Sequence, residues 1–487
     1  LRDPTINLGN TVQNSRTIQV NPTFAMSKLY NKFGFIRKSL NRTDSTTSFA
    51  DVMVGIITSV KNINVAFTQT KGTFLPGYLP KTKYFGIDDA TGAPGLGFVF
   101  GSQRDIRDMA YGNGWLTTDE LQTQLYINTL REDFQLTGTI EPIKDLKVTL
   151  SATRNKTLNY STNFRYDNSI STFRNLSPTT TGDYSVSIIS FGTAFKDFMA
   201  NRQVISARLG AQNPNSSGTS NGFADGYDKT AQDVVISSFI AAYTGKDASS
   251  SSLRSLPKIP LPNWRLTYGG LSKIPFVADK FSELSLRHGY RSIYSVNGFN
   301  TLLKYEEANG FVRSRDVNQN FLPYYQFSQV NISEQFAPLI GIDTRMKNNM
   351  TASFEINKTR IMALSLANSQ LAQLSENNLI FGLGYRTTKF RFPFGWFSNL
   401  KMDNNMDFKL EMSVRDGKTV IYRADIEEAE VSSGQKNISL RPSVDYVLNQ
   451  RFNVKLFYDS NITKPYTSQS FNTSFSNFGF SLRMTLN

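Results

Sequence analysis

Few residues of this chain have the types and spacing that catalysis requires. The 487 residues include a single histidine, His288, and no cysteine. His288 alternates with Leu284, Leu286 and Tyr290, so in a strand it shares their apolar face. A Ser-His-Asp triad or a zinc site needs polar partners that such a face does not offer. The sequence therefore predicts a structural histidine, no catalytic residue and no enzyme.

Two further motifs suggest metal or phosphate binding, and both fail on spacing. An acidic run consists of Asp425, Glu427, Glu428 and Glu430. It lacks the glycine-hinged spacing of a calcium loop, and we favour a solvated outer loop. The segment GLGFVFG (95–101) resembles a phosphate loop, but Phe100 stands where GxGxxG requires glycine. We expect no metal and no cofactor.

The strongest pattern is the alternation of apolar and polar residues up to the end of the sequence. Its apolar positions are Phe478, Phe480, Leu482, Met484 and Leu486. Successive side chains of a strand point to opposite faces, so this pattern predicts a two-faced strand. The pattern recurs at 438–448 and 452–458, which a short polar turn joins. Outer-membrane barrels are built from such strands, apolar toward lipid and polar toward the lumen.

This alternation assigns each strand residue to one of two faces. The expected lipid-facing residues are Leu284, Leu286, Phe354, Leu440, Val444, Leu456, Phe478, Phe480, Leu482 and Met484. The expected lumen-facing residues are Arg287, Arg291, Asp343, Arg345, Lys347, Arg441, Lys455 and Arg483. A wide, hydrated pore needs polar walls along which cargo can slide, although strand alternation alone also accounts for these residues.

Composition excludes several classes of protein. No stretch approaches 18 consecutive apolar residues, so no transmembrane helix is expected. The net charge of +14 is spread over strand and loop positions without a basic helix or an RNP-type motif, so nucleic acid is not an expected partner. The aromatic content of 13% fits the aromatic girdles of a barrel.

The expected fold is all-β, an antiparallel transmembrane outer-membrane β-barrel with long loops and a few helical insertions. Barrel strands are expected in 1–190 and 284–487, with a helical or irregular insertion in 191–283. Within 1–190 we expect a large outer loop at 71–118 and a periplasmic-side helical insertion at 28–61, with a helix from Ser48 to Val60.

Helix-like stretches lie near 194–209 and 230–244, and a parity slip at Arg131–Asp133 suggests a bulge. With the C-terminus on the periplasmic side, the alternating strand directions fix the side of each loop. They put 191–262 in the periplasm or the lumen, and they put 71–118 and 297–337 outside.

Two loop regions are rich in aromatic residues. One contains Phe74, Tyr78, Tyr84, Phe85, Phe98, Phe100 and Trp115; the other contains Phe321, Tyr324, Tyr325 and Phe327. These side chains either pack among the loops or form a docking surface for a partner protein. The sequence does not distinguish the two interpretations.

Several segments together resemble one family. They are LPGYLP (75–80), APGLGFVFGSQ (93–103), GWLTTDE (114–120), PNWRLTYGGLSKIPF (262–276), LRHGYRSIYSV (286–296), LIGIDTRMKN (339–348), SGQKNISLRPSVDYVLNQRFNVKLFYD (433–459) and NFGFSLRMTLN (477–487). In this order they resemble the C-terminal part of the SprA/Sov family, the outer-membrane translocons of the type IX secretion system.

The resemblance implies a very large single-chain barrel that exports folded proteins through a passive pore with a lateral opening, a system linked to gliding motility. It implies as partners the N-terminal strands of the same barrel, a shuttle barrel, a periplasmic plug protein, secreted cargo, and lipid or lipopolysaccharide. The chain begins at Leu1 without an initiator Met or a signal sequence, so we expect a portion of a longer protein. An independent porin-like or nutrient-uptake barrel is one alternative, and an adhesin or enzyme on a barrel scaffold is another.

Overall fold

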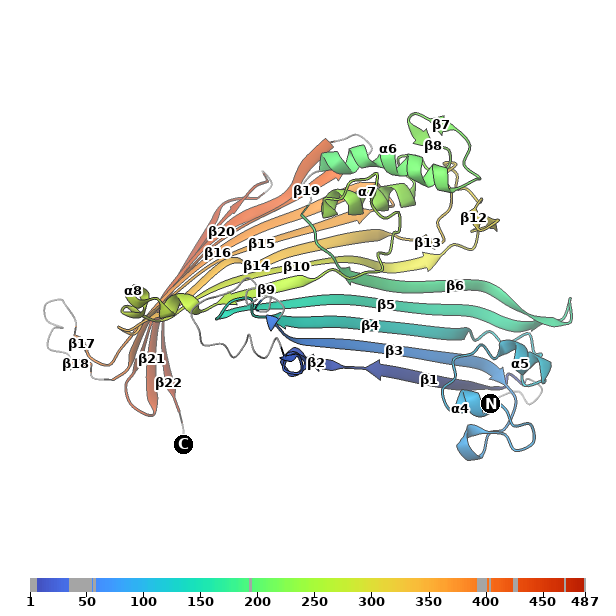
Figure 1. Cartoon of the computed structure of the whole chain (residues 1–487), viewed down its shortest axis with the longest axis horizontal. Helices are drawn as coiled ribbons and strands as arrows, with labels where there is room; N and C mark the ends of the chain where they lie inside the picture. The colour runs from blue at the N-terminus through green and yellow to red at the C-terminus, as the bar shows by residue number, and fades with distance from the viewer. Residues whose placement is uncertain are drawn as a thin grey trace.

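The chain folds around one long, curved, antiparallel sheet of 16 strands (Figure 1). The computed structural model describes residues 7–34, 55, 58–191, 195–391, 401–402, 404–423, 428–467 and 470–485. Along the main path of the sheet each long strand pairs with the next one in the chain, in the order β1-β3-β4-β5-β6-β10-β14-β15-β16-β19-β20-β21-β22. In the described part of the chain, no helix has both the length and the apolar character needed to span a membrane. The antiparallel sheet of 16 strands confirms the predicted all-β architecture.

The long strands are β1 (Asn10–Val20), β3 (Val60–Tyr78), β4 (Tyr126–Ile140), β5 (Leu146–Asp167), β6 (Thr172–Ser187), β10 (Phe281–Thr301), β14 (Gln329–Met346), β15 (Met350–Ser365), β16 (Gln370–Thr387), β19 (Met406–Arg423), β20 (Glu428–Val447), β21 (Phe452–Pro465) and β22 (Thr473–Met484). The short strands are β2 (Thr23–Ala25), β7 (Thr219–Ser220), β8 (Phe223–Ala224), β9 (Asn263–Tyr268), β11 (Glu307–Ala308), β12 (Phe311–Val312), β13 (Tyr325–Gln326), β17 (Phe390–Arg391) and β18 (Lys401–Met402). The helices are α1 (Met26–Tyr30), η1 (Tyr84–Gly86), α4 (Leu96–Val99), α5 (Arg107–Gly112), α6 (Phe195–Gln212), α7 (Gln232–Thr244), η2 (Gly270–Lys273) and α8 (Pro275–Ala278).

The two ends of the sheet differ in their connections. At one end, called here the turn end, short turns at 141–145, 347–349 and 448–451 join neighbouring strands, and β22 ends there. At the other end, called the loop end, the long segment 79–125 follows β3 and the segment 302–324 follows β10. Short turns also occur at the loop end, at 168–171 and 366–369, and the longer connection 269–280 lies at the turn end.

One position in the sheet is filled by two separate strands. β6 and β9 both lie between β5 and β10, β6 toward the loop end and β9 toward the turn end. On β5, Arg154 pairs with Val186 of β6, and Ser151 pairs with Asn263 of β9. The insertion 188–262 therefore leaves the sheet between two strands, β6 and β9, that lie end to end in the same position, and it returns to the point where it left. The backbone amide of Leu261 donates to the carbonyl of Ser187 (2.8 Å), which closes the base of the insertion.

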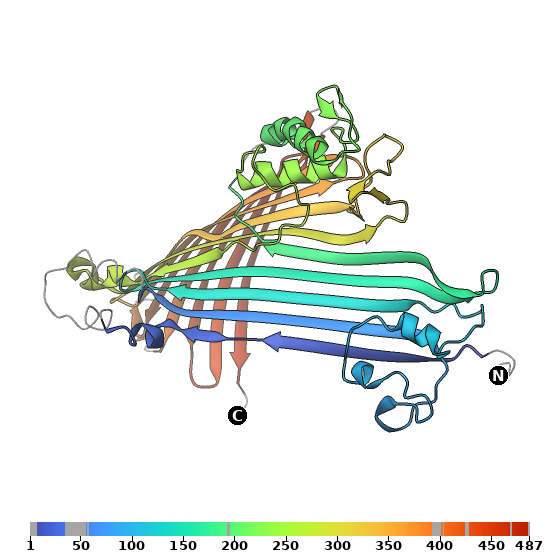
Figure 2. The same ribbon diagram turned by 45° about the vertical axis from the view of Figure 1, so that its right-hand side comes forward.

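Helices α6 and α7 of this insertion pack against one face of the sheet (Figures 1 and 2). The shared core contains Phe198, Val235, Ile236, Phe239 and Tyr243 from the helices and Tyr294, Val296, Val330, Ile332, Met362, Leu364 and Leu371 from the sheet. These residues are almost fully buried, so the insertion is anchored by a continuous apolar core.

The segment 79–125 packs on the same face of the sheet, nearer β1. Its core contains Ala93, Phe98, Ile106, Ala110, Trp115 and Leu116, which lie against Leu75, Tyr78, Tyr126 and Phe164 of the strands. The register shows that the face is the same. Lys71 of β3 pairs with Leu130, and Leu130 pairs with Leu158, which packs against the first core. Leu75 lies four residues after Lys71 on β3, and residues an even number apart on a strand share a face.

The structure corrects several expectations about the segments. Residues 71–78 belong to β3, so the outer loop expected at 71–118 begins only after Tyr78. No register shift marks Arg131–Asp133, because β4 begins at Tyr126 and pairs evenly with β5. The helices α6 and α7 lie where the sequence predicted helical stretches. The helix expected from Ser48 to Val60 falls almost entirely outside the described residues.

The insertion 191–262 was expected in the periplasm or the lumen, and 297–337 outside. The two segments contact each other at the loop end, so the periplasmic alternative, which needs them at opposite ends of the sheet, is wrong. The guanidinium of Arg315 binds the carboxylate of Asp225 through two hydrogen bonds of 2.7 Å, and Asn213 donates to the carbonyl of Val312. Counting strands failed to predict the position of the insertion because β6 and β9 together fill one position in the sheet and do not count as two neighbouring strands.

Candidate functional site: a two-faced wall

One face of the sheet carries a continuous apolar belt along its turn-end half. The register joins residues into rows across neighbouring strands, such as Phe354, Phe381, Met412 and Leu440, and then Val444, Leu456 and Phe480. Toward β1 the belt continues through Leu284, Leu286, Ile342, Leu266, Val148, Leu150, Leu136 and Val65. We call this surface the belt and this side of the sheet the belt face.

The belt has a nearly constant height. It covers Met350–Ile356 on β15, Leu379–Tyr385 on β16 and Phe408–Val414 on β19. At about 3.4 Å per residue, such seven-residue stretches measure about 20 Å along the strand. Outer-membrane barrels carry an apolar band of about 25 Å. On these three strands the belt is therefore somewhat shorter than the stretch of about 9–11 residues with which a tilted strand crosses a bilayer.

Aromatic residues flank the belt on both edges. At the turn-end edge lie Tyr268, Tyr385, Phe408, Tyr446 and Phe452. At the opposite edge the rings of Trp264 and Tyr290 stack with centroids 4.4 Å apart, and Tyr290 lies 4.9 Å from Phe336. The turn-end residues form a row across the sheet, whereas those at the opposite edge form a cluster on β9, β10 and β14; aromatic residues at both edges of an apolar band are typical of interfacial girdles.

From the belt toward the loop end, the same face first carries charged side chains and is then covered by the helices α6 and α7. Charged side chains on this side include Arg154, Lys156, Lys358, Arg360, Asp416 and Lys418. Arg360 forms an ion pair of 2.8 Å with Glu334, and both side chains are nearly buried (12% and 6% exposed). The apolar surface of the belt therefore ends at a definite level along the strands.

The opposite face, called here the polar face, carries ion pairs between neighbouring strands. Arg287 of β10 pairs with Asp343 of β14 and, at 3.6 Å, with Glu355 of β15. Further pairs are Arg415–Glu376, Arg386–Asp407, Lys409–Asp445 and Arg441–Asp459. Exposed pairs add little to stability. Their main consequence is a hydrated surface that carries both signs of charge.

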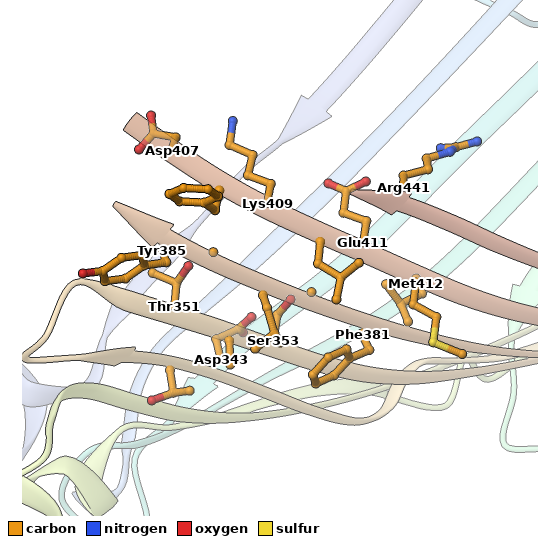
Figure 3. Close-up of a pocket in the computed structure, with 18 of the residues that line it drawn as sticks. Asp343, Thr351, Ser353, Phe381, Tyr385, Asp407, Lys409, Glu411, Met412 and Arg441 are labelled. Carbon is orange, nitrogen blue, oxygen red and sulfur yellow. The ribbon is translucent and has the colours of Figure 1, made fainter. Parts of the chain in front are cut away.

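The polar face is hollowed into a broad groove of about 960 Å³ between β14 and β20 (Figure 3). Figure 3 shows Asp407, Lys409 and Arg441 on one side of the strands, and Phe381 and Met412 on the other. The groove is open and lined by short polar and charged side chains, including Thr351 and Ser353. No cluster of histidine and acidic residues suited to a metal ion occurs among the residues that the structure describes.

The register brings the residues expected in the lumen to this single face. Lys455 lies opposite Asp445 and Ser481, and Arg483 lies opposite Asn453. Arg345 and Arg291 alternate with belt-face residues on β14 and β10. Lys347 is an exception, since it lies in the turn between β14 and β15. His288 lies on the belt face, where its Nδ1 is 2.7 Å from the carbonyl oxygen of Leu339.

The aromatic loop residues separate into two groups. Tyr78, Phe98, Trp115, Phe321 and Phe327 are buried in loop cores, and Phe74 lies within β3, so these residues are unsuited to anchoring a partner. Tyr325 packs against Phe299 with a centroid distance of 4.8 Å. Tyr84, Phe85, Phe100 and Tyr324 remain exposed. Loop packing therefore accounts for most of the aromatic residues, and sequence composition alone could not separate the groups.

Both outer strands of the sheet have an unpaired edge in the described part of the chain. β1 pairs with β3 only, and β22 pairs with β21 only. Along β22 the belt-face side chains Phe478, Phe480, Leu482 and Met484 are more than half exposed. Open edges present free backbone donors and acceptors to any further strand.

No family model and no curated protein matches the chain. Two solved structures of the RagAB system, described as a peptide transporter and as a peptide importer in the closed-closed state, are 8% identical to it, with a TM-score of 0.24. Each comparison covers 83% of this chain and 44% of the RagAB chain, so the chain spans less than half the length of these structures. At this TM-score the likeness carries no argument.

Proposed function

We propose that this chain forms part of the wall of a very large outer-membrane β-barrel that exports folded proteins, as in the type IX translocons of the SprA/Sov family. The observation that supports this most is the level apolar belt on one face of a long antiparallel sheet, with a charged face opposite. Lipid on the belt side and water on the polar side satisfy both surfaces at once.

In this orientation the belt contacts lipid and lipopolysaccharide, and the aromatic residues at its edges lie at the two interfaces. The turn end, where β22 ends, faces the periplasm, and the loop end faces the exterior. Long strands such as β5 (Leu146–Asp167) then extend well beyond the membrane, because a tilted strand crosses the bilayer with about 9–11 residues. The insertion 188–262 covers the outer side of the wall above the bilayer.

The open edges of the sheet support a composite wall. Unpaired backbone groups cannot remain in the hydrocarbon core, since each costs several kcal/mol there. The edges at β1 and β22 therefore pair with further strands, which we assign to the rest of the same barrel. An independent porin-like barrel requires β1 to pair directly with β22 instead.

The polar face then lines the pore. Many of its charges are paired across strands, which leaves a hydrated surface that carries both signs of charge. The chain supplies a passive conduit, and energy, a periplasmic plug and a shuttle barrel come from other proteins. No step of this mechanism requires a catalytic residue.

A depletion experiment tests this function. In cells that stop making the whole protein, a folded reporter fused to a secreted cargo is expected to accumulate in the periplasm, while uptake of small nutrients stays unchanged. Re-expression of the unaltered protein is expected to restore surface delivery. Continued surface delivery together with a loss of nutrient uptake would contradict export and favour the porin-like alternative.

A further inference from the structure

A cavity of about 460 Å³ lies at the loop end, between the insertion 188–262 and the segment 302–327. Its walls come from the C-terminal turn of α6, the first turn of α7, the segment 253–256 and the loop around β12 and β13. The cavity is distinct from the polar-face groove, because its lining residues belong to the substructure on the belt face.

The acidic group in this cavity is Asp233, in the first turn of α7. Within the described residues, its side chain receives one hydrogen bond, from the hydroxyl of Ser255 at 3.4 Å, and forms no ion pair. Burial raises the pKa of Asp233 above its usual value. Arg254 also lines the cavity, but its side chain is exposed. The carboxylate thus lacks a cationic partner.

Three tyrosines line the same cavity as this carboxylate, and Tyr305 interacts with it electrostatically. The rings of Tyr305 and Tyr324 pack edge to face with centroids 5.3 Å apart, and those of Tyr324 and Tyr325 do so at 4.7 Å. All three line the cavity. Aromatic faces around a carboxylate attract a cation, which gains from the ring quadrupoles and from the negative charge.

We propose that this cavity binds a basic side chain, lysine or arginine, presented by another polypeptide at the loop end. The ammonium or guanidinium group pairs with Asp233, and its alkyl stem lies against the tyrosine rings. The cavity is large enough for one such side chain. Tyr324, which is 52% exposed, lies at the entrance.

The position of the cavity favours a polypeptide over a lipid headgroup. Tyr325 pairs with Thr301 at the end of β10, whereas the belt edge on the same strand is at Tyr290. Those eleven residues correspond to about 36 Å along the strand. This position is beyond the level that bilayer lipids reach if the belt marks the hydrocarbon core, as proposed above.

Binding can be measured directly on the full-length protein in detergent by saturation-transfer NMR. The probes are N-acetyl-lysine amide, N-acetyl-arginine amide and the uncharged isostere N-acetyl-norleucine amide. We expect the two basic probes to bind at least 10-fold more tightly than norleucine. Asp233→Asn is expected to abolish this preference, and Tyr324→Leu to weaken binding several-fold while Tyr324→Phe retains it.

Asp197→Asn is the matched control, since Asp197 is an exposed aspartate in the first turn of α6 outside the cavity. Equal binding of lysine and norleucine, or unchanged binding by the Asp233→Asn protein, would overturn the proposal. Vesicles containing phosphatidylethanolamine serve as a further competitor, and competition by these vesicles but not by basic peptides would also overturn the proposal. A purely structural role of Asp233 at the helix N-terminus predicts altered stability with no change in ligand preference.

Discussion

At the scale of single residues, the buried pair of Glu334 and Arg360 joins β14 to β15 just beyond the belt. We expect Arg360→Met to destabilise the folded protein by about 3–5 kcal/mol, because the change leaves the buried Glu334 carboxylate without its partner. Resistance of the folded band to heating in detergent measures this effect. Replacing both residues, Glu334→Leu with Arg360→Met, is expected to recover most of the loss.

The matched control for this pair is Arg386→Met, which breaks an ion pair with Asp407 of similar geometry on the polar face. The Arg386 side chain is 66% exposed, so solvent screens the pair and we expect little change. Equal losses from Arg360→Met and Arg386→Met would mean that Glu334 and Arg360 are not buried beneath the insertion.

The second prediction concerns Asp233 and the pH dependence of the free energy of unfolding. Burial raises its pKa in the folded state, so folding favours the protonated acid and stability falls as pH rises from the unfolded pKa, near 3.9, through the folded one. Burial also raises the pKa of Tyr305 and Tyr325, so these two tyrosines do not ionise in this window.

Asp233→Asn is therefore expected to stabilise the protein at pH 7, by about 1 kcal/mol or more. The gain should disappear below about pH 4, where the aspartate is protonated in both states. Thermal unfolding at the two pH values measures the difference. A loss of stability at pH 7 would show that the ionised carboxylate makes favourable contacts in the folded protein.

At the scale of elements, each strand has two chemically different faces. Met412 lies in the belt and Ser413 on the polar face of the same strand. We expect Met412→Arg to impair membrane assembly, because an arginine facing the bilayer core costs about 2–4 kcal/mol. Ser413→Arg, one residue away, should assemble normally. The measurement is the amount of heat-modifiable protein in the outer-membrane fraction, and equal effects of both changes would contradict the assignment of faces.

Alternation in the sequence predicted these strands well where each strand is continuous. Residues 438–447 and 452–458 lie in β20 and β21 as expected, although Leu448 belongs to the turn, and the turn at 347–349 joins β14 to β15. The same pattern also predicts which side chains share a face. Successive side chains of a strand alternate between two faces, so assigning one residue assigns all the others of that strand.

Two features could not be predicted from that local pattern. The six residues of β9 give too short a signal to reveal that they continue the line of β6 after an insertion. The belt face changes from apolar to charged and again to buried apolar along one strand, as at Phe354, Arg360 and Met362 of β15. Alternation assigns all three to one face, but only the tertiary structure shows that the last one contacts α7 and not lipid.

At the scale of the whole molecule, the chain is a curved wall with unlike surfaces and two open edges. Both large substructures cover the belt face at the loop end, and the turn-end half of that face remains as the belt. Sequence composition suggested this division of surfaces only weakly, since a mean hydropathy of −0.33 is that of a soluble protein. The apolar surface becomes apparent only when alternate residues of neighbouring strands are brought into register.

The most direct test of this account is a scan of spin labels along β19 from Phe408 to Val414, in the full-length protein in outer membranes. These 487 residues contain no cysteine, so within them each introduced cysteine is labelled alone. We predict that collisions with dissolved oxygen are strongest at 408, 410, 412 and 414, and that collisions with a water-soluble nickel chelate are strongest at 409, 411 and 413. The opposite phase, or an absence of alternation, would contradict a wall with lipid on its belt face and water on its polar face.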